Sequence, residues 1–84
     1  MDSIQGKRAL VTGGGSGIGE AIVRELAGGG ASVLIHYYKS KDPAEALAAD
    51  IVSRGGEAST FQADLSREED VKKLFRHIET TWGT

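Results

Sequence analysis

The segment from Thr12 to Gly19 reads TGGGSGIG and lies between a short apolar run and a helical pattern. A loop between a buried strand and a helix presents backbone amides and the positive end of the helix dipole, and both attract phosphate. Glycine is needed where a Cβ would block close approach or where φ is positive. We expect Gly13 to form the turn, Gly17 to let a pyrophosphate approach, and Gly19 to let the helix pack closely on the sheet.

The spacing of these glycines, Gly13-x-x-x-Gly17-x-Gly19, differs from the more widespread Gly-x-Gly-x-x-Gly pattern. A glycine cluster alone is a weak signal. Here a strand precedes it, a helix follows it, and a β-α-β unit of suitable length contains it. The segment therefore predicts a site for a nicotinamide dinucleotide, and a simple turn without a ligand is the alternative.

The next candidate position is the end of the second predicted strand, about 20 residues after the glycines, where Tyr37 stands. Dinucleotide-binding folds that prefer NAD place a carboxylate there to bind the ribose 2′-hydroxyl. Such a carboxylate would repel the 2′-phosphate of NADP. Its absence, with Lys39, Ser40 and Lys41 close by, favours NADP over NAD. In the alternative interpretation the two lysines lie in a solvated loop without a ligand.

These positions require a framework of alternating strands and helices. Apolar and β-branched runs predict strands over 9–11, 32–36 and 58–63. Short connections imply right-handed parallel crossovers, hence an α/β fold with three parallel strands in the order 3-2-1 and helices on both faces, the N-terminal half of a Rossmann fold. Apolar positions at helical spacing are Ile18, Ala21, Ile22 and Leu26, then Leu47, Ala48 and Ile51, then Val71, Leu74, Phe75, Ile78 and Trp82.

Two capping boxes indicate where the second and third helices begin. Asp42-Pro43-Ala44-Glu45 places Asp42 at the N-cap and Pro43 at the first helical position. Ser66-Arg67-Glu68-Glu69 places Ser66 at the N-cap of the third helix. The residues from Tyr37 to Lys41 are expected to form a loop.

With these residues in place, the sequence resembles the short-chain dehydrogenases/reductases. TGGGSGIG matches the family's TGxxxGIG motif, Ala63-Asp64-Leu65 looks like the Asp-Leu pair after the third strand, and Thr81-Trp82-Gly83 is similar to the segment before the fourth strand. The resemblance covers the whole chain. It implies that residues 1–84 are the NAD(P)-binding part of an oxidoreductase that transfers hydride between NADP(H) and a carbonyl or alcohol.

The resemblance also implies roles for individual residues. Asp64 would accept a hydrogen bond from the adenine amino group, and Leu65 would give an apolar wall. Ser16 and Ile18 would touch the phosphates through the loop, while Thr12 would brace the turn. In the alternative interpretation Asp64 only caps a turn.

The segment from His36 to Lys41 is similar to the Asn-Tyr-x-x-Ser-Lys pattern of 3-oxoacyl-acyl-carrier-protein reductases and glucose 1-dehydrogenases. That match places Ser40 on the 2′-phosphate. The chain departs from the pattern of many NADP-binding members at Ser16, where they carry a basic residue.

The family's catalytic pair is Tyr-x-x-x-Lys, in which the lysine lowers the tyrosine pKa. Tyr37 and Lys41 have this spacing, but the family's pair stands on a helix beside the nicotinamide. We therefore expect no catalytic residue in this chain, and the family's catalytic elements would follow Thr84.

Composition excludes several other classes. Ten Lys and Arg against twelve Asp and Glu give a net charge of −2, without blocks of one sign, which argues against nucleic-acid or membrane partners. There is no cysteine, and the two histidines lack ligand-like neighbours, so no metal site is expected. The N-terminus has no apolar leader segment, so a cytoplasmic location is expected.

A different class of function stays open. The chain can instead be a stand-alone nucleotide-binding or interaction module without catalysis. The predicted strand 9–11 would lie at the sheet edge, where it can pair with another chain by strand addition.

Overall fold

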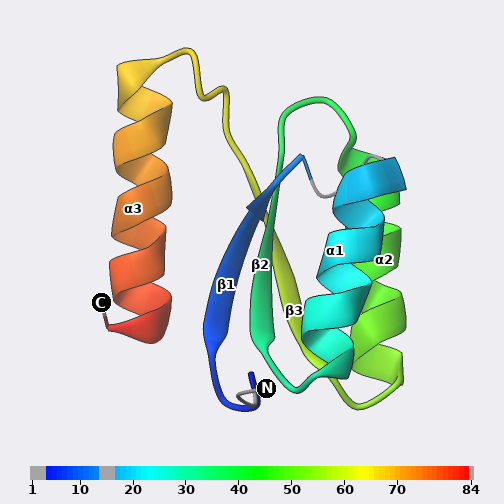
Figure 1. Ribbon diagram of the computed structural model, residues 1–84. Coiled ribbons are helices and arrows are strands. Elements are labelled where there is room, and N and C mark those ends of the chain that lie inside the picture. The colour runs from blue at the N-terminus through cyan, green and yellow to red at the C-terminus, as the bar shows by residue number, and fades with distance from the viewer. Residues whose placement is uncertain (1–3, 14–16, 84) are drawn as a thin grey trace.

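The computed structural model describes residues 4–13 and 17–83 and alternates strands and helices in the predicted order (Figure 1). Ser16 therefore lies outside the described residues. The strands and helices, in chain order, are β1 (Arg8–Thr12), α1 (Gly17–Gly28), β2 (Ser32–Tyr37), α2 (Lys41–Ser53), β3 (Glu57–Gln62) and α3 (Glu68–Trp82).

The three strands form a parallel sheet with β2 in the middle, which confirms the order 3-2-1. Ile35 at the centre of β2 is in register with Val11 of β1 and Thr60 of β3. Helices α1 and α2 cover one face of the sheet and α3 lies on the other (Figure 1). Because all strands run the same way, their carboxyl ends meet at one edge of the sheet.

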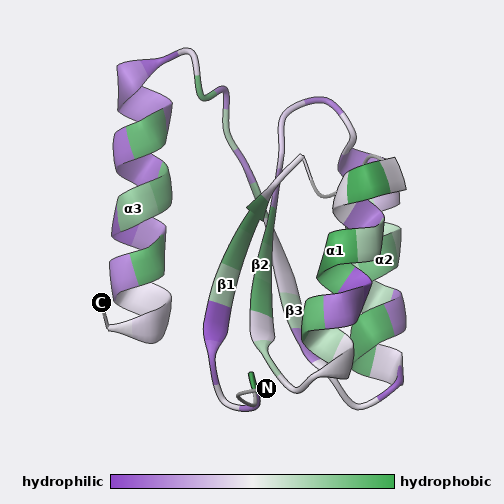
Figure 2. Ribbon diagram, viewed as in Figure 1, coloured by the Kyte–Doolittle hydropathy of each residue, from purple (hydrophilic) through white to green (hydrophobic). Residues whose placement is uncertain are grey.

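The core lies between β2 and the helix pair α1 and α2. Val33 and Ile35 of β2 are almost fully buried, as is Val23 of α1. Apolar residues run along β2, and α1 and α2 carry apolar residues interspersed with polar ones, as Figure 2 shows. A strand that is apolar on consecutive residues is typical of a parallel sheet covered on both faces.

The buried side of α1 differs from the prediction. Gly19 and Val23 are buried, whereas Ile18 is 79% exposed and Ile22 is 47% exposed. A helical turn needs about 3.6 residues, so the inward stripe that passes through Gly19 and Val23 turns Ile18 and Ile22 outward. In α2 the predicted inward residues are buried as expected: Leu47, Ala48 and Ile51.

Helix α3 is held to the sheet by a few contacts. Its buried residue, among those that the structure describes, is Leu74. The ring of His77 lies 4.6 Å from that of Phe61, and Nη1 of Arg8 donates to the carbonyl of Trp82 at 2.9 Å. Phe75 was predicted to point inward but is 56% exposed, because it lies a third of a turn away from Leu74 on the helix surface.

Both predicted helix starts were wrong. In α2 the amide of Ala44 donates to the carbonyl of Ser40, so Ser40, not Asp42, is the N-cap. Pro43 then lies in the first turn, where an amide is not needed. In α3 the N-cap is Arg67, because Ser66 turns toward Asp64 instead.

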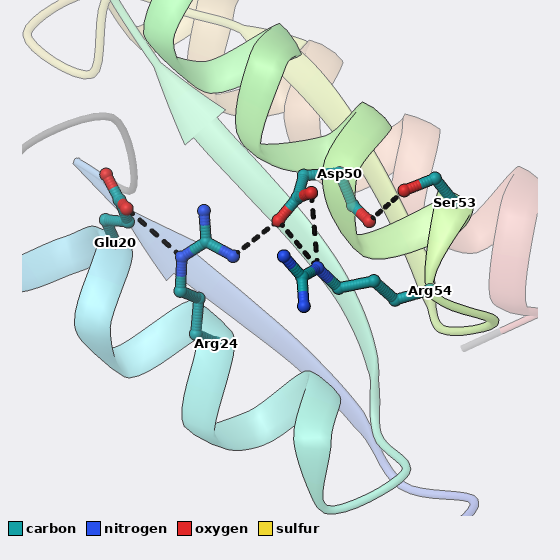
Figure 3. A network of polar contacts seen from close by, with 5 residues as sticks. All are labelled: Glu20, Arg24, Asp50, Ser53 and Arg54. Carbon is teal, nitrogen blue, oxygen red and sulfur yellow. Dashed lines mark hydrogen bonds and ion pairs between the residues drawn. The ribbon is translucent and has the colours of Figure 1, made fainter.

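An ionic network joins α1 to α2 (Figure 3). Arg24 of α1 contacts Glu20 through Nε at 3.1 Å and Asp50 of α2 through Nη1 at 2.7 Å. Arg54 approaches the same Asp50 carboxylate at 3.1 Å. Hydrogen bonds from Arg24 and then Arg54 lower the pKa of Asp50 below its ordinary value of 3.8. One carboxylate thus links two helices that the sequence separates by a strand.

Replacing Asp50 tests this link between the helices. Because its pKa is lowered in the folded chain, its contribution is present above the unfolded pKa and is lost as pH falls through the folded pKa. Asp50→Asn should lower the melting temperature at neutral pH by about 3 °C, as for a partly exposed ion pair. The difference from the wild type should shrink below about pH 4. Glu45→Gln, on the same helix and without an ion pair to a described residue, is the control for thermal unfolding, and an equal loss there would contradict the role of Asp50.

Candidate functional site

The carboxyl edge of the sheet brings the predicted site residues together. The loops after β1, β2 and β3 all leave this edge, and α1 and α2 begin there (Figure 1). Large apolar side chains are exposed on these three connections: Ile18, Tyr38 and Leu65. Exposed apolar groups gathered at one edge are typical of a ligand-binding surface.

The glycines of the first loop have separate roles. Gly13 has φ +66°, which confirms the predicted turn, and Gly19 is buried where α1 packs on the sheet. Gly17 is the first residue of α1, and a Cβ added there would meet no described atom within 4 Å. Packing therefore does not require glycine at this position. The space that a Cβ would fill suits a ligand that approaches the backbone.

The second loop carries the residues predicted to select the cofactor. Tyr37 ends β2, and its side chain is only 7% exposed. Tyr38 is exposed, with Nζ of Lys39 at 5.5 Å from its ring. Ser40 makes no side-chain capping bond, so its hydroxyl has no structural task among the described residues. Lys41 is the first residue of α2 and not, as predicted, part of the loop.

The structure separates Tyr37 from Lys41 in a way that bears on catalysis. Tyr37 ends a strand and Lys41 begins a helix, so the two residues do not stand one turn apart on a helix. They therefore lack the arrangement in which a lysine acts on the tyrosine of a Tyr-x-x-x-Lys pair.

The third loop is ordered around Asp64. Its Oδ1 accepts hydrogen bonds from the amide of Ser66 at 3.0 Å and from Oγ of Ser66 at 2.6 Å. Its own amide donates to Oδ2 of Asp70 at 2.8 Å. The two bonds from Ser66 hold the pKa of Asp64 below its ordinary value, and the charges of Arg67 and Lys39 add to this effect.

Asp64 therefore caps a turn, which was the alternative interpretation of this residue. The contacts of its carboxylate with described residues all fall on Oδ1. Its contact with adenine stays a prediction, and Oδ2 is the oxygen that could make it. Leu65 beside it is 41% exposed, so an apolar surface is available next to that oxygen.

His36 is a residue at the edge of the site to which the sequence assigned no role of its own, beyond its place in the second strand and in the His36–Lys41 pattern. Its side chain is 6% exposed, and its Nε2 lies 2.8 Å from the carbonyl oxygen of Ala63, next to Asp64. The sequence could have drawn attention to His36 as a titratable residue among the apolar residues of its strand.

A groove of about 350 Å³ lies at the opposite edge, between the C-terminal ends of α1 and α2. Arg24, Arg54 and Glu57 line it with several glycines. None of the predicted site residues lies there. The candidate phosphate-binding position is therefore the glycine loop at the carboxyl edge, not this groove.

Among residues 4–13 and 17–83, no group of three or more His, Cys, Asp or Glu side chains is arranged to hold a metal ion. Within the same residues, no helix combines the length and apolar character needed to cross a membrane.

Comparisons with known proteins give a consistent result. The family described as short chain dehydrogenase matches residues 7–84. The short-chain dehydrogenase/reductase homolog YusS of Bacillus subtilis is 44% identical over 82 residues, which are 98% of this chain and 75% of that protein. Elsinochrome reductase 1 of Elsinoe fawcettii is 49% identical over 80 residues, which are 95% of this chain but 30% of the relative.

A solved structure is similar over almost the whole chain. The short chain dehydrogenase from Burkholderia cenocepacia J2315, in complex with NADP, superposes with a TM-score of 0.88 at 43% identity. The match covers 98% of this chain and 34% of that protein. The chain thus spans about a third of the length of this protein.

The turn around Asp64 can be tested without a ligand. Ser66→Ala removes the hydroxyl donor but keeps the amide donor, so the pKa of Asp64 should rise toward its ordinary value without reaching it. A carboxyl-carbon NMR titration measures this. Ser53→Ala, whose hydroxyl bonds the Asp50 carbonyl, is the control and should leave the Asp64 titration in place. An unchanged pKa in Ser66→Ala would contradict the described turn.

Proposed function

The chain belongs to the short chain dehydrogenase family, and from this premise we propose that it binds the pyrophosphate and adenosine half of NADP. The observation that carries the proposal is the open position at Gly17, where a Cβ would meet no described atom within 4 Å although the residue begins a helix beside a positive-φ turn. Packing does not require glycine at this position, and because it is at a helix N-terminus the open space leaves room for a phosphate to approach the backbone.

The proposed site residues come from all three loops of the carboxyl edge. Pyrophosphate is bound by the first loop and the start of α1, with the 2′-phosphate on the second loop and adenine on the third. The full set is Gly13, Ser16, Gly17, Ile18, Gly19, Tyr37, Lys39, Ser40, Lys41, Asp64 and Leu65, of which Ser16 lies outside the described residues.

Charge favours NADP over NAD at this site. The strand end that would carry a 2′-hydroxyl-binding carboxylate carries Tyr37 instead, and Lys39 follows at the exposed surface. Ser40 stands at the N-cap of α2 without a side-chain capping bond, so its hydroxyl is available to a phosphate. The similar protein from Burkholderia cenocepacia is described as a complex with NADP.

A longer enzyme that contains this segment would transfer hydride between NADP(H) and a carbonyl or alcohol. The bound cofactor supplies the hydride chemistry, while the described residues bind and orient its adenosine end. We propose no catalytic residue within the chain. From the similarity of the segment His36–Lys41 to their pattern, we propose that such an enzyme is related to the 3-oxoacyl-acyl-carrier-protein reductases and glucose 1-dehydrogenases. We also propose that it is located in the cytoplasm.

Calorimetry with the 84-residue chain tests the proposed function. NADPH should bind about tenfold more tightly than NADH, because one additional charged phosphate contact is worth roughly 1.4 kcal/mol. Lys39→Ala should reduce the ratio of NADPH affinity to NADH affinity. Equal affinities for the two cofactors would contradict the assignment of NADP, and no affinity for either would contradict the proposed function itself.

A pair of glycine substitutions separates binding from folding in this experiment. Gly17→Ala and Gly28→Ala stand at opposite ends of α1, and at both positions a Cβ meets no described atom within 4 Å. Alanine favours a helix over glycine, so neither should lower stability. Gly17→Ala should weaken NADPH binding by at least about tenfold through steric exclusion, whereas Gly28→Ala should leave it unchanged.

The edge of the sheet favours a second role. Strand β1 pairs with β2 alone among the described strands, and its sequence RALVT is mainly apolar. An unpaired apolar edge is a template for another strand, so we propose that isolated chains self-associate through β1.

Native mass spectrometry over a range of concentrations tests self-association. Dimers should appear as concentration rises, and hydrogen exchange should slow for the amides of residues 9–11 in the dimer because strand pairing protects them. A chain that stays monomeric throughout, or a dimer without this protection, would overturn pairing through β1.

A further inference from the structure

His36 interrupts the apolar sequence of β2 at the carboxyl edge. It is in register with Thr12 of β1 and Phe61 of β3, and its neighbours along the strand are Ile35 and Tyr37. The residue is 6% exposed. A polar ring buried to this extent costs free energy unless it makes a hydrogen bond. The hydrogen-bond partner of the His36 ring therefore indicates the structural role of this side chain.

That partner is the backbone carbonyl of Ala63, 2.8 Å from Nε2 of His36. A carbonyl oxygen only accepts, so Nε2 carries the proton in this bond and Nδ1 is the unprotonated nitrogen of the neutral ring. Nδ1 is buried and has no partner among the described residues. Turning the ring over would take Nε2 away from the carbonyl of Ala63 and lose this bond. The hydrogen bond therefore fixes one tautomer and one ring orientation.

The carbonyl of Ala63 needs this donor because the strand has ended. The register of β3 with β2 stops at Gln62, opposite Tyr37. The amide of Ala63 still donates to the carbonyl of Tyr37 at 3.0 Å, but the chain after Tyr37 turns away toward α2. His36 supplies from its side chain the bond that the next residue of a longer strand would have supplied from its backbone. Both polar groups of Ala63 are thus tied to the end of β2.

Asp64 follows Ala63 in the chain. Its amide is bonded to Asp70 and its Oδ1 to Ser66. Its backbone is therefore fixed on the β2 side through Ala63 and on the α3 side through Asp70. We propose that His36 is a positioning residue for the adenosine end of the site, acting through Ala63 to set where Asp64 presents its carboxylate. This inference rests on the proposed function, since it assumes that Asp64 meets the ligand.

Two ligand fragments distinguish positioning from general stability. Adenosine 2′,5′-bisphosphate would use the second and third loops in addition to the glycine loop, which takes its 5′-phosphate, whereas inorganic pyrophosphate would use the glycine loop alone. His36→Phe keeps a flat ring but removes the donor. It should weaken the adenosine bisphosphate about tenfold, as expected when the geometry behind one charge-assisted contact is lost, and leave pyrophosphate within about twofold of the wild type. His36→Gln, which carries an amide donor at a similar reach, should restore most of the lost affinity.

A stability control accompanies these variants. Ile51→Val shortens a buried side chain of α2, remote from the carboxyl edge and beside the groove at the other end. It should lower the melting temperature and leave both fragments bound as in the wild type. If Ile51→Val weakened the adenosine bisphosphate as much as His36→Phe does, the effect would be one of stability, and the positioning role would be overturned.

Failure of this inference differs from failure of the proposed function. If the wild type binds neither fragment, the proposed function is wrong. If it binds both and His36→Phe binds both equally well, only the positioning role is wrong. Nitrogen-15 NMR of the wild-type ring gives a test that needs no variant. Nε2 should be the protonated nitrogen, and its resonance should move with adenosine bisphosphate but not with pyrophosphate. A ring protonated at Nδ1 alone would overturn the inference.

Discussion

The burial of β2 on both faces is the constraint on which the rest of this structure depends. A central strand must be hydrogen-bonded on both sides, and parallel neighbours can be joined only by crossovers that return the chain to the starting edge. The helices α1 and α2 make these crossovers and cover one face. As a result, every strand ends at the same edge. One apolar strand, β2, thereby brings together at this edge three loops that differ in chemistry.

What the edge can bind follows from how its backbone groups are satisfied. Where the β1 loop enters α1, a positive-φ glycine and an open glycine precede the amides of a helix start. Where β3 ends, side chains of His36, Asp64 and Asp70 satisfy backbone groups instead. The first arrangement leaves room for a phosphate, and the second fixes a carboxylate. A dinucleotide site needs both the room for a phosphate and the fixed carboxylate, separated by the width of one or two strands.

The sequence predicted the strands and their order well, because each strand contains apolar or β-branched residues and the short connections allow only parallel crossovers. It predicted helix starts poorly. Asp42 and Ser66 fit capping patterns, but the carbonyl of Ser40 bonds earlier, and Ser66 bonds Asp64. These competing partners depend on where the preceding strand ends. Phe75 was misplaced because one apolar stripe does not say how much of α3 the sheet can cover. The contacts of the site residues with a cofactor stay predictions, since they depend on the ligand as well as on the chain.

The slight attachment of α3 has a consequence for the order in which the chain loses structure. Among the described residues, its attachment consists of the buried side chain of Leu74, a ring contact and a bond to a helix-terminal carbonyl, and α3 has fewer buried residues than α1 or α2. Regions of this kind unfold locally before the whole domain does. The turn at Asp64 joins β3 to α3, and the Asp64 amide bonds Asp70 of that helix. If the proposed ligand contacts Asp64, a ligand that binds more tightly when α3 is docked would stabilise the docked helix by mass action.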